Sequence, residues 1–297
     1  MVRIREGWIA NKIELMGHTD SKGPNVPTDS FKKFNRIVGR AIHPATGKPT
    51  DIFDYQEEYE RAWNSHHKLI LNKSRKIGAT ETALRIIAFN CMNGRYKSQH
   101  RVMIVAGNKQ EVANRFIERF VAIFGEGFED LDGKWWALDD IIVERKSSKL
   151  ILFNGIVIQA YPANESVRGE ENVICVFMSE SAFINLLDDS KVYNAVHPNV
   201  ANIGDADFVL ESTPNGKRGF FWNLYTDVDN EYYKLEQPYT VAMGKLLDEK
   251  TIEAEKKNPF IDFEQEYCCK FTTSLSSVFK EDDVRYEAKA IDNYDDL

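Results

Sequence analysis

The sequence predicts an α/β fold, in which a mainly parallel β-sheet is flanked by helices. Three stretches are almost entirely apolar, as strands buried on both faces are: residues 101–106, in which only Arg101 is polar, 173–178 and 208–210. Segments with helical spacing lie between the expected strands, one of them over residues 110–124. Strands that alternate with helices along a chain are typical of a parallel sheet covered by helices.

The composition is that of an ordinary globular protein. The chain has 297 residues, 43% hydrophobic and 28% charged, enough for one large core or two modest ones. It contains no run of 18 apolar residues and no apolar signal segment behind Met1, so we expect no membrane association and no secretion. The cysteines show no C-x-x-C spacing and are expected to be reduced thiols: Cys91, Cys175, Cys268 and Cys269.

The formal net charge of −8 is concentrated at the end of the chain. Residues 281–297 hold seven acidic side chains against two basic ones, a net charge of −5, which leaves −3 for the first 280 residues. Proteins that track along DNA hold it through local basic patches. An acidic total therefore does not exclude a nucleic-acid partner.

The sequence pattern divides the chain into four parts. Residues 1–50 are polar and interrupted by glycine and proline, which predicts an N-terminal arm with at most one helix. Residues 51–235 carry the alternating strands and helices and form the expected core. Residues 236–280 are helical and charged in pattern, which predicts a small C-terminal helical subdomain, and residues 281–297 form an acidic tail or linker.

Two further elements are expected in the core, and one apparent motif is rejected. Residues 51–66 predict a helix, and apolar runs on both sides of Asn154-Gly155 predict a β-hairpin over residues 150–161. Gly47-Lys48-Pro49-Thr50 contains the Gly-Lys pair of a phosphate loop but not its structural context. No strand is expected before it, and Pro49 lacks the backbone donor that such a loop needs.

The segment over residues 68–89 predicts a strand, a loop and a helix. Residues 69–71 are apolar, and residues 81–89 have helical spacing. In such a unit, successive backbone N–H groups and the helix N-terminus bind anions. The alternative is an ordinary basic turn between a strand and a helix.

The loop in this segment departs from the usual phosphate loop, G-x-x-x-x-G-K-[ST]. Gly78 and Thr80 stand where the pattern requires them. Lys73 replaces the first glycine, however, and Ala79 replaces the lysine whose charge meets the β- and γ-phosphates. The loop can still bind phosphate if another cation reaches the same point.

The apolar strand over residues 173–178 is followed by Ser179 and Glu180. In a Walker B motif, a strand of this kind ends in two acids: the first steadies Mg²⁺ and the second orients the attacking water. Ser179 replaces the first acid, so weakened metal affinity or slow turnover is expected. Alternatively, Glu180 is only a solvated glutamate at the end of a strand.

Two more segments bring polar groups toward the same region. The strand over residues 208–210 runs into Ser212-Thr-Pro-Asn-Gly216, which places hydroxyl and amide groups at a third strand end. Upstream of the loop, Phe53-Asp-Tyr-Gln56 supplies an amide that can pair with the edge of adenine. A single glutamine is more often an ordinary surface residue.

Taken in order, these segments resemble the ATPase domain of the large terminase subunit, the DNA-packaging motor of tailed viruses, over about residues 50–275. A variant of that family's phosphate loop has the form Lys-Ser-x-x-x-Gly, and Lys73-Ser-Arg-Lys-Ile-Gly78 is similar to it. The family's Walker B motif continues from Asp-Glu through small residues to Ala-Phe, as Ser179-Glu-Ser-Ala-Phe183 does after its first residue. The family's coupling motif, Thr-Pro-Asn-Gly after a strand, matches residues 213–216.

The resemblance implies a P-loop NTPase of the ASCE (RecA-like) class that binds ATP and Mg²⁺. Lys73 would contact the β- and γ-phosphates, with Arg75 and Lys76 as alternative cations, and Gln56 would bind adenine. The nucleotide-binding residues implied in this way are Gln56, Lys73, Ser74, Arg75, Lys76, Ile77, Gly78, Ala79, Thr80 and Glu81.

The resemblance also implies metal, coupling and catalytic roles. Thr80 would ligate Mg²⁺, with Ser179 as a candidate to reach the ion through water. Glu180 would activate the attacking water, so that Glu180 and Lys73 are two of the expected catalytic residues. The residues expected to sense the γ-phosphate are those of the coupling motif: Ser212, Thr213, Pro214 and Asn215.

Arg168 is the third expected catalytic residue. It stands in an Arg-Gly pair before the Walker B strand, where the family has an arginine finger that reaches the nucleotide of a neighbouring subunit. The alternative is a loop arginine paired with Glu165 or Glu170.

The resemblance implies partners and a location. These are double-stranded DNA, the portal protein, the small terminase subunit and further copies of the chain in a ring, expected to be a pentamer, in the cytoplasm of the infected host cell and on the procapsid during packaging. No nuclease activity is expected, because the chain stops near the point where the family's nuclease domain would begin.

Two other functions stay open. Ser179 and Ala79 are compatible with a nucleotide-binding but catalytically weak assembly module. A helicase-like P-loop ATPase acting on another nucleic acid would share the loop and the Walker B strand, although the coupling motif disfavours it. Turnover of ATP by the purified chain, with and without DNA, separates the packaging motor from the assembly module.

Overall fold

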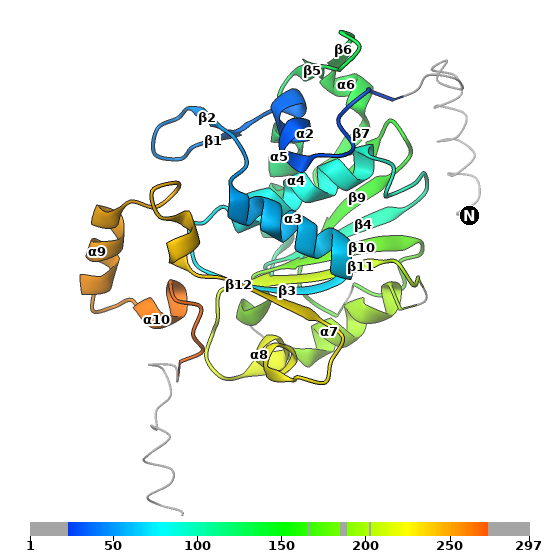
Figure 1. Cartoon of the computed structure of the whole chain (residues 1–297). Coiled ribbons are helices and arrows are strands. Elements are labelled where there is room, and N and C mark those ends of the chain that lie inside the picture. The colour runs from blue at the N-terminus through cyan, green and yellow to red at the C-terminus, as the bar shows by residue number, and fades with distance from the viewer. Residues whose placement is uncertain (1–22, 166, 185–188, 202, 273–297) are drawn as a thin grey trace, which may run out of the picture.

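The computed structural model describes residues 23–272, except residues 166, 185–188 and 202, and these residues are built around one large β-sheet (Figure 1). From one edge to the other the strands are β12 (Tyr233–Gln237), β3 (Lys68–Lys73), β11 (Asp207–Ser212), β10 (Val173–Ser179), β4 (Arg101–Ala106), β9 (Val157–Tyr161), β8 (Lys149–Leu152) and β7 (Ile142–Lys146). The strands from β12 to β9 run parallel, and β8 and β7 continue the sheet antiparallel. The predicted mainly parallel α/β fold is confirmed, and the predicted hairpin is formed by β8 and β9.

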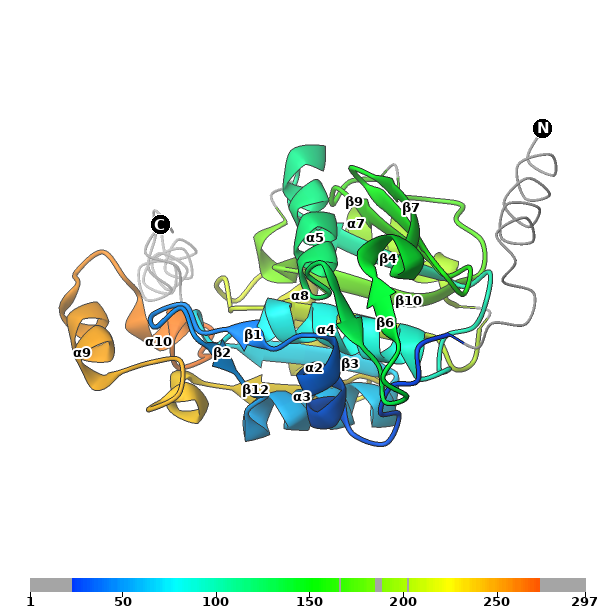
Figure 2. The same ribbon diagram turned by 90° about the horizontal axis from the view of Figure 1, so that it is seen from above.

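Helices cover both faces of this sheet, and Figures 1 and 2 both show α3 and α4 side by side on one of them. The elements of this face, here called the α4 face, are α2 (Phe31–Val38), α3 (Asp54–His66), α4 (Ala79–Met92) and α5 (Gln110–Ala122). The opposite face packs against α7 (Ser190–Val196) and α8 (Gly219–Thr226). Alternate strand residues enter the two cores, so that Phe177 of β10 packs on the α4 face and Met178 on the other.

Short elements complete the described part of the chain. They are β1 (Ala41–Ile42), β2 (Pro49–Thr50), β5 (Gly127–Glu129), β6 (Trp135–Ala137), α6 (Leu138–Ile141), α9 (Glu249–Lys257), α10 (Phe263–Glu266) and the 3₁₀ turns η1 (Ser181–Phe183), η2 (His197–Asn199) and η3 (Tyr239–Ala242). No helix among the described residues is both long and apolar enough to cross a membrane.

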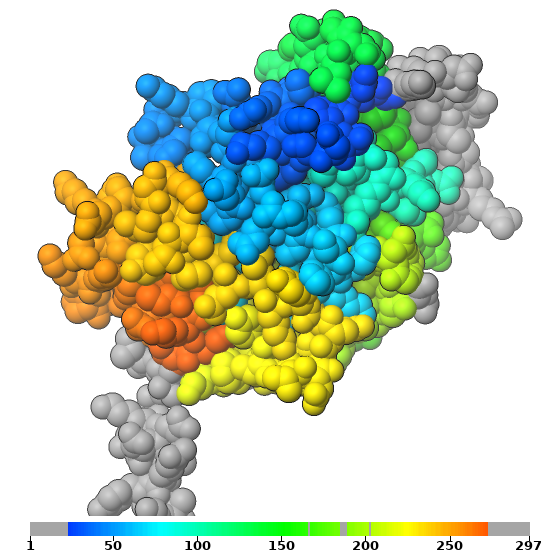
Figure 3. Space-filling view, in the orientation of Figure 1, coloured from blue at the N-terminus to red at the C-terminus, as the bar shows by residue number. Residues whose placement is uncertain are grey.

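Part of the expected N-terminal arm packs against the core, and the expected boundary at residue 235 lies inside a strand. Residues 31–38 of the expected arm form α2, whose buried Phe31 and Phe34 rings lie 5.7 and 5.2 Å from the ring of Phe89 in α4. Figure 3 shows this blue segment lying against the body of the molecule. The boundary at residue 235 cuts β12, which pairs with β3 as far as Gln237 because its backbone groups complete the sheet edge. The acidic segment 281–297 lies outside the described residues.

A buried carboxylate fixes the start of β11. Asp207 is fully buried and accepts hydrogen bonds from Trp63 Nε1 at 3.0 Å, Arg95 Nη2 at 2.8 Å and the Tyr96 hydroxyl. His67 Nδ1 lies 2.9 Å from the same carboxylate. This network joins α3 and the segment after α4 to the strand that separates β3 from β10.

We expect Asp207→Ala to lower the free energy of unfolding by about 3 kcal/mol, since it leaves buried donors and the charge of Arg95 without their acceptor. Urea unfolding monitored by circular dichroism measures the change. Asp205→Ala, which alters an exposed acid two residues away, is the matched control and should change stability by less than about 0.5 kcal/mol. Equal effects of the two substitutions would contradict a structural role of this network.

Candidate functional site

The carboxyl ends of three neighbouring strands bring the expected site residues together. Lys73 ends β3, Ser179 ends β10 and Ser212 ends β11, which lies between the other two strands. Ligands bind at this end of a parallel sheet.

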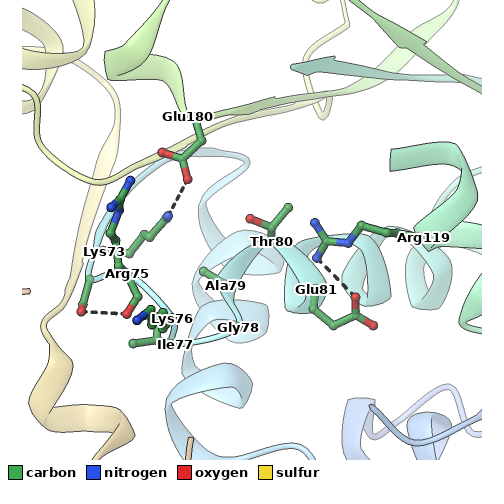
Figure 4. A pocket seen from close by; sticks show the side chains of 11 residues that line it. Lys73, Arg75, Lys76, Ile77, Gly78, Ala79, Thr80, Glu81, Arg119 and Glu180 are labelled. Carbon is green, nitrogen blue, oxygen red and sulfur yellow. Dashed lines mark hydrogen bonds and ion pairs between the residues drawn. The ribbon is translucent and has the colours of Figure 1, made fainter. Parts of the chain in front are cut away.

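The phosphate loop, residues 73–80, lines a cavity of about 400 Å³ (Figure 4). Gly78 has φ +77° and forms the N-cap of α4, so that the helix begins at Ala79 with its N-terminus beside the cavity. The cavity is lined by all nine loop and helix residues expected from the sequence, 73–81, and by Glu180 and Arg119. This volume is within the range of ordinary ligand sites.

Lys73 and Glu180 form the central ion pair of the cavity. Lys73 Nζ lies 2.7 Å from Glu180 Oε1 and 4.0 Å from Glu211 Oε1. Burial opposes the charge of Lys73, yet the two carboxylates raise its pKa above the usual lysine value, so the side chain is a cation. The loop therefore contains a buried positive charge, although its usual lysine position is Ala79.

The other two candidate cations of the loop are directed to the C-terminal part of the chain. Arg75 Nε lies 2.7 Å from Glu266 Oε2, and Lys76 Nζ lies 3.0 Å from Glu255 Oε1. Their side chains are 55% and 57% exposed, against 8% for Lys73. Burial and position favour Lys73 as the cation inside the cavity.

Two residues of the site have backbone conformations that are uncommon for side-chain-bearing residues. Glu180 has φ +53° and Lys76 has φ +61°. The left-handed conformation of Glu180 turns the chain sharply at the end of β10 and presents its carboxylate to the loop. Such conformations concentrate at functional sites because the surrounding structure must hold them.

Thr80 contacts a residue that the sequence analysis did not assign. Thr80 Oγ1 donates a hydrogen bond of 2.7 Å to Glu211 Oε1 in β11. Glu211 is fully buried, and burial raises its pKa to about 7, against the lowering effect of Lys73. Glu211 directly follows the apolar run of residues 208–210, but its partners are set by the order of the strands, which the sequence pattern does not contain.

The residues at this point fit a Mg²⁺ ion bound together with nucleotide. Thr80 lines the cavity, and two buried oxygen atoms of the neighbouring strand ends, Ser179 Oγ and Glu211 Oε2, have no hydrogen-bond partner among the described residues. Within the described ranges no group of three or more His, Cys, Asp or Glu residues could hold a metal alone. That suits Mg²⁺, which is usually held by few protein groups together with phosphates and water.

Gln56 lies at the mouth of an adjoining cavity of about 630 Å³, which also borders Gly78 and Arg119. Its Oε1 accepts a hydrogen bond from Phe53 N at 3.0 Å, which caps α3 and fixes the side chain. The neighbouring Tyr55 donates from its hydroxyl to Ile77 O at 2.8 Å and so ties this helix to the loop. The structure therefore brings Gln56 next to the loop, as an adenine-binding role requires.

The coupling motif contacts the chain that follows Glu180 and does not line the phosphate cavity. Ser212 Oγ accepts from Ala182 N at 3.1 Å, and Asn215 Nδ2 donates to Ala182 O at 2.9 Å. Thr213 and Pro214 are buried. These two contacts link the segment to the chain that follows Glu180, and sensing of the γ-phosphate by Ser212, Thr213, Pro214 and Asn215 stays a prediction.

Arg168 is exposed and does not line the cavity, and its alternative partner Glu170 pairs with Arg101 at 3.1 Å. Arg119 of α5 is a cavity cation that the sequence analysis missed. It lines both cavities and lies 3.4 Å from Glu81 Oε2 (Figure 4). No loop motif marks Arg119, because it enters the site through the packing of α5 beside α4.

The family model of the N-terminal part of the T4-like-virus-type large terminase subunit matches residues 70–285 of this chain. The match begins in β3 and includes the loop, β10 and β11. No curated protein sequence matches the chain.

Solved structures of large terminases have a similar fold. The ATPase domain from Thermus phage P74-26 is 18% identical, with a TM-score of 0.50, over 76% of this chain and 94% of that domain. The bacteriophage HK97 large terminase is 15% identical, with a TM-score of 0.61, over 81% of this chain and 53% of that protein. The large terminase of the thermophilic bacteriophage D6E in complex with ADP is 12% identical, with a TM-score of 0.55, over 74% and 53%. The chain thus spans about half the length of the HK97 and D6E proteins.

Proposed function

This chain belongs to the family of T4-like-virus-type large terminase subunits, and from that premise we propose that it hydrolyses ATP to drive double-stranded DNA into a procapsid. The family match and the ATPase fold support the nucleotide part of this proposal. The D6E relative was determined with ADP and with ATP-γ-S, which supports ATP as the substrate class. The coupling to DNA translocation is carried over from the family.

The single observation that carries the proposal is the Lys73–Glu180 ion pair at 2.7 Å inside the phosphate-loop cavity. A buried lysine of the loop and a carboxylate from the end of β10 are two of the groups that the protein supplies for phosphoryl transfer to water. Their contact supports Lys73 as the substitute for the lysine missing at position 79.

The proposed chemistry assigns separate tasks to the two partners. The phosphates of ATP attract the Lys73 ammonium, which holds the β- and γ-phosphates and leaves Glu180 free to accept a hydrogen bond from the attacking water. Gln56 holds adenine, and backbone N–H groups at the start of α4 face the phosphates. Mg²⁺, when bound beside Thr80, neutralises charge on the phosphate oxygens.

ATP turnover by the purified chain, measured alone and with double-stranded DNA, tests this proposal. We expect turnover that rises when double-stranded DNA is added. Nucleotide binding without turnover under either condition would instead support the weak assembly module, which the serine at position 179 favours. Equal stimulation by single-stranded DNA would favour the helicase-like alternative.

The proposed partners are the portal protein, the small terminase subunit and a ring of further copies, expected to be a pentamer, on the procapsid in the host cytoplasm. The exposed position of Arg168 outside its own chain's cavity supports a role across a subunit boundary. A finger that acts within its own subunit would have to line the cavity.

We expect Arg168→Ala to leave nucleotide affinity of the isolated chain unchanged and to lower turnover of the portal-bound ring by about 10³- to 10⁵-fold. The reason is that the arginine neutralises charge on a neighbouring subunit's transferring phosphoryl group only when the ring is assembled. Steady-state phosphate release is the measurement, and Arg145→Ala, which alters another exposed arginine, is the control. An equal loss of turnover in isolated monomers would contradict action between subunits.

A further inference from the structure

Position 179 lacks the first Walker B carboxylate, but a carboxylate stands directly beside it on the next strand. In the parallel pairing of β10 with β11, Ser179 is the register partner of Glu211. Side chains of register partners point to the same face of a sheet. Both residues belong to the set that faces α4, since Phe177 and Val209, two positions earlier in each strand, pack in the core of that face.

The contacts of Glu211 are those of a metal-site carboxylate. Its Oε1 accepts the hydrogen bond of 2.7 Å from Thr80 Oγ1, the hydroxyl that the phosphate loop offers to Mg²⁺, and it lies 4.0 Å from Lys73 Nζ. Its second oxygen, Oε2, is buried and has no hydrogen-bond partner, and neither has the neighbouring Ser179 Oγ. The carboxylate that Thr80 contacts and the register partner of that residue thus each carry an unpartnered buried oxygen.

The two buried oxygen atoms without hydrogen bonds are unfavourable in energy, which indicates that Glu211 and Ser179 face a bound cation or its water molecules. A buried oxygen without a hydrogen bond has lost its interaction with water and gained none in return, and the loss is larger for a charged group. Lys73 is shared between Glu180 and Glu211, so one cation serves two carboxylates. A further cation and its water molecules would satisfy both the charge and the vacant acceptors.

We propose that Glu211 takes over the task of the carboxylate missing at position 179: it is a positioning residue that orients Thr80 and the water molecules of nucleotide-bound Mg²⁺. The inference rests on the proposed function, because the ion arrives with the nucleotide. It also removes the expectation that Ser179 by itself weakens metal affinity, since the carboxylate is displaced by one strand rather than lost.

Binding of the fluorescent nucleotide mant-ADP, titrated in EDTA and at increasing MgCl₂, tests the inference without requiring turnover. For Glu211→Gln we expect the Mg²⁺ concentration at half-effect to rise about 10- to 100-fold, the usual effect of losing a residue that supports a metal ligand. Binding in EDTA should stay at the wild-type level. Asp207→Asn, an isosteric change of the other buried acid of β11, is the control and should leave the Mg²⁺ dependence unchanged.

The double variant Ser179→Asp with Glu211→Gln provides the decisive comparison. It returns a carboxylate to the end of β10 and should restore the Mg²⁺ dependence of the wild type. Thermal unfolding shows whether each variant is folded, and Glu211→Asp, which keeps the charge and shortens the side chain, replaces Glu211→Gln if the latter does not fold.

Two results would overturn the inference. If Glu211→Gln weakens binding equally in EDTA and in Mg²⁺, and Ser179→Asp restores nothing, Glu211 only supports Lys73 and Thr80. If the wild-type chain binds mant-ADP under neither condition, the proposed function itself fails and the inference fails with it. The first pattern leaves wild-type nucleotide binding intact, so the two failures are distinguishable.

Discussion

Glu180→Gln is expected to lower the turnover number for ATP by about 10²- to 10⁴-fold, the usual contribution of a positioned general base. Gln keeps the shape of the side chain but cannot accept a proton from the attacking water. Nucleotide affinity should be equal to or higher than that of the wild type, because ATP no longer competes with the Lys73–Glu180 ion pair for the lysine.

Steady-state phosphate release and mant-ADP binding measure these two effects separately. Glu253→Gln, which alters a half-exposed glutamate of α9 paired only with Lys256, is the matched control and should behave as wild type. Equal turnover of the wild type and of Glu180→Gln would exclude Glu180 as the residue that activates water. A parallel loss of affinity and turnover would show that it acts in binding.

Lys73→Met is expected to raise the dissociation constant for ATP-γ-S by about 10- to 100-fold, the equivalent of losing one hydrogen bond from a charged donor. Met keeps a buried apolar side chain of similar length at this position and removes the charge. Turnover should fall as well, since the same cation balances charge on the γ-phosphate.

Lys76→Met is the matched control for the loop. Lys76 is more than half exposed and is paired with Glu255, so its removal should change nucleotide affinity little. Isothermal titration calorimetry gives both constants. The opposite result, with Lys76→Met abolishing binding and Lys73→Met leaving it intact, would move the phosphate-binding lysine three residues along the loop.

Most of the sheet could be predicted because its strands are continuous apolar runs. The expected strand at 101–106 is β4 without change, and the strand at 173–178 is one residue shorter than β10. The short strand β12 was missed, since Tyr233–Gln237 lies at the sheet edge, has only five residues and contains a single aliphatic side chain, Leu235. Its place is decided by pairing with β3 rather than by its own pattern.

The meeting of the loop and Glu180 in one cavity could also be predicted, because both follow strands directly in the sequence. Glu211 and Arg119 could not, since their roles depend on which strands and helices become neighbours. Glu211 reaches Thr80 and Lys73 only because β11 lies between β3 and β10, and that strand order cannot be read from the sequence pattern. The contacts of the coupling motif could not be predicted for the same reason: Ser212 Oγ and Asn215 Nδ2 form hydrogen bonds with the backbone of Ala182, which follows another strand.

A structure of the chain with ATP-γ-S and Mg²⁺ would test the central claim, that Lys73 replaces the lysine missing from the loop. We predict that Lys73 Nζ leaves Glu180 and contacts the β- and γ-phosphates, that Mg²⁺ lies beside Thr80 on the side of Glu211, and that Glu180 faces the γ-phosphate. Lys73 still paired with Glu180, with Lys76 or Arg119 on the phosphates instead, would contradict it.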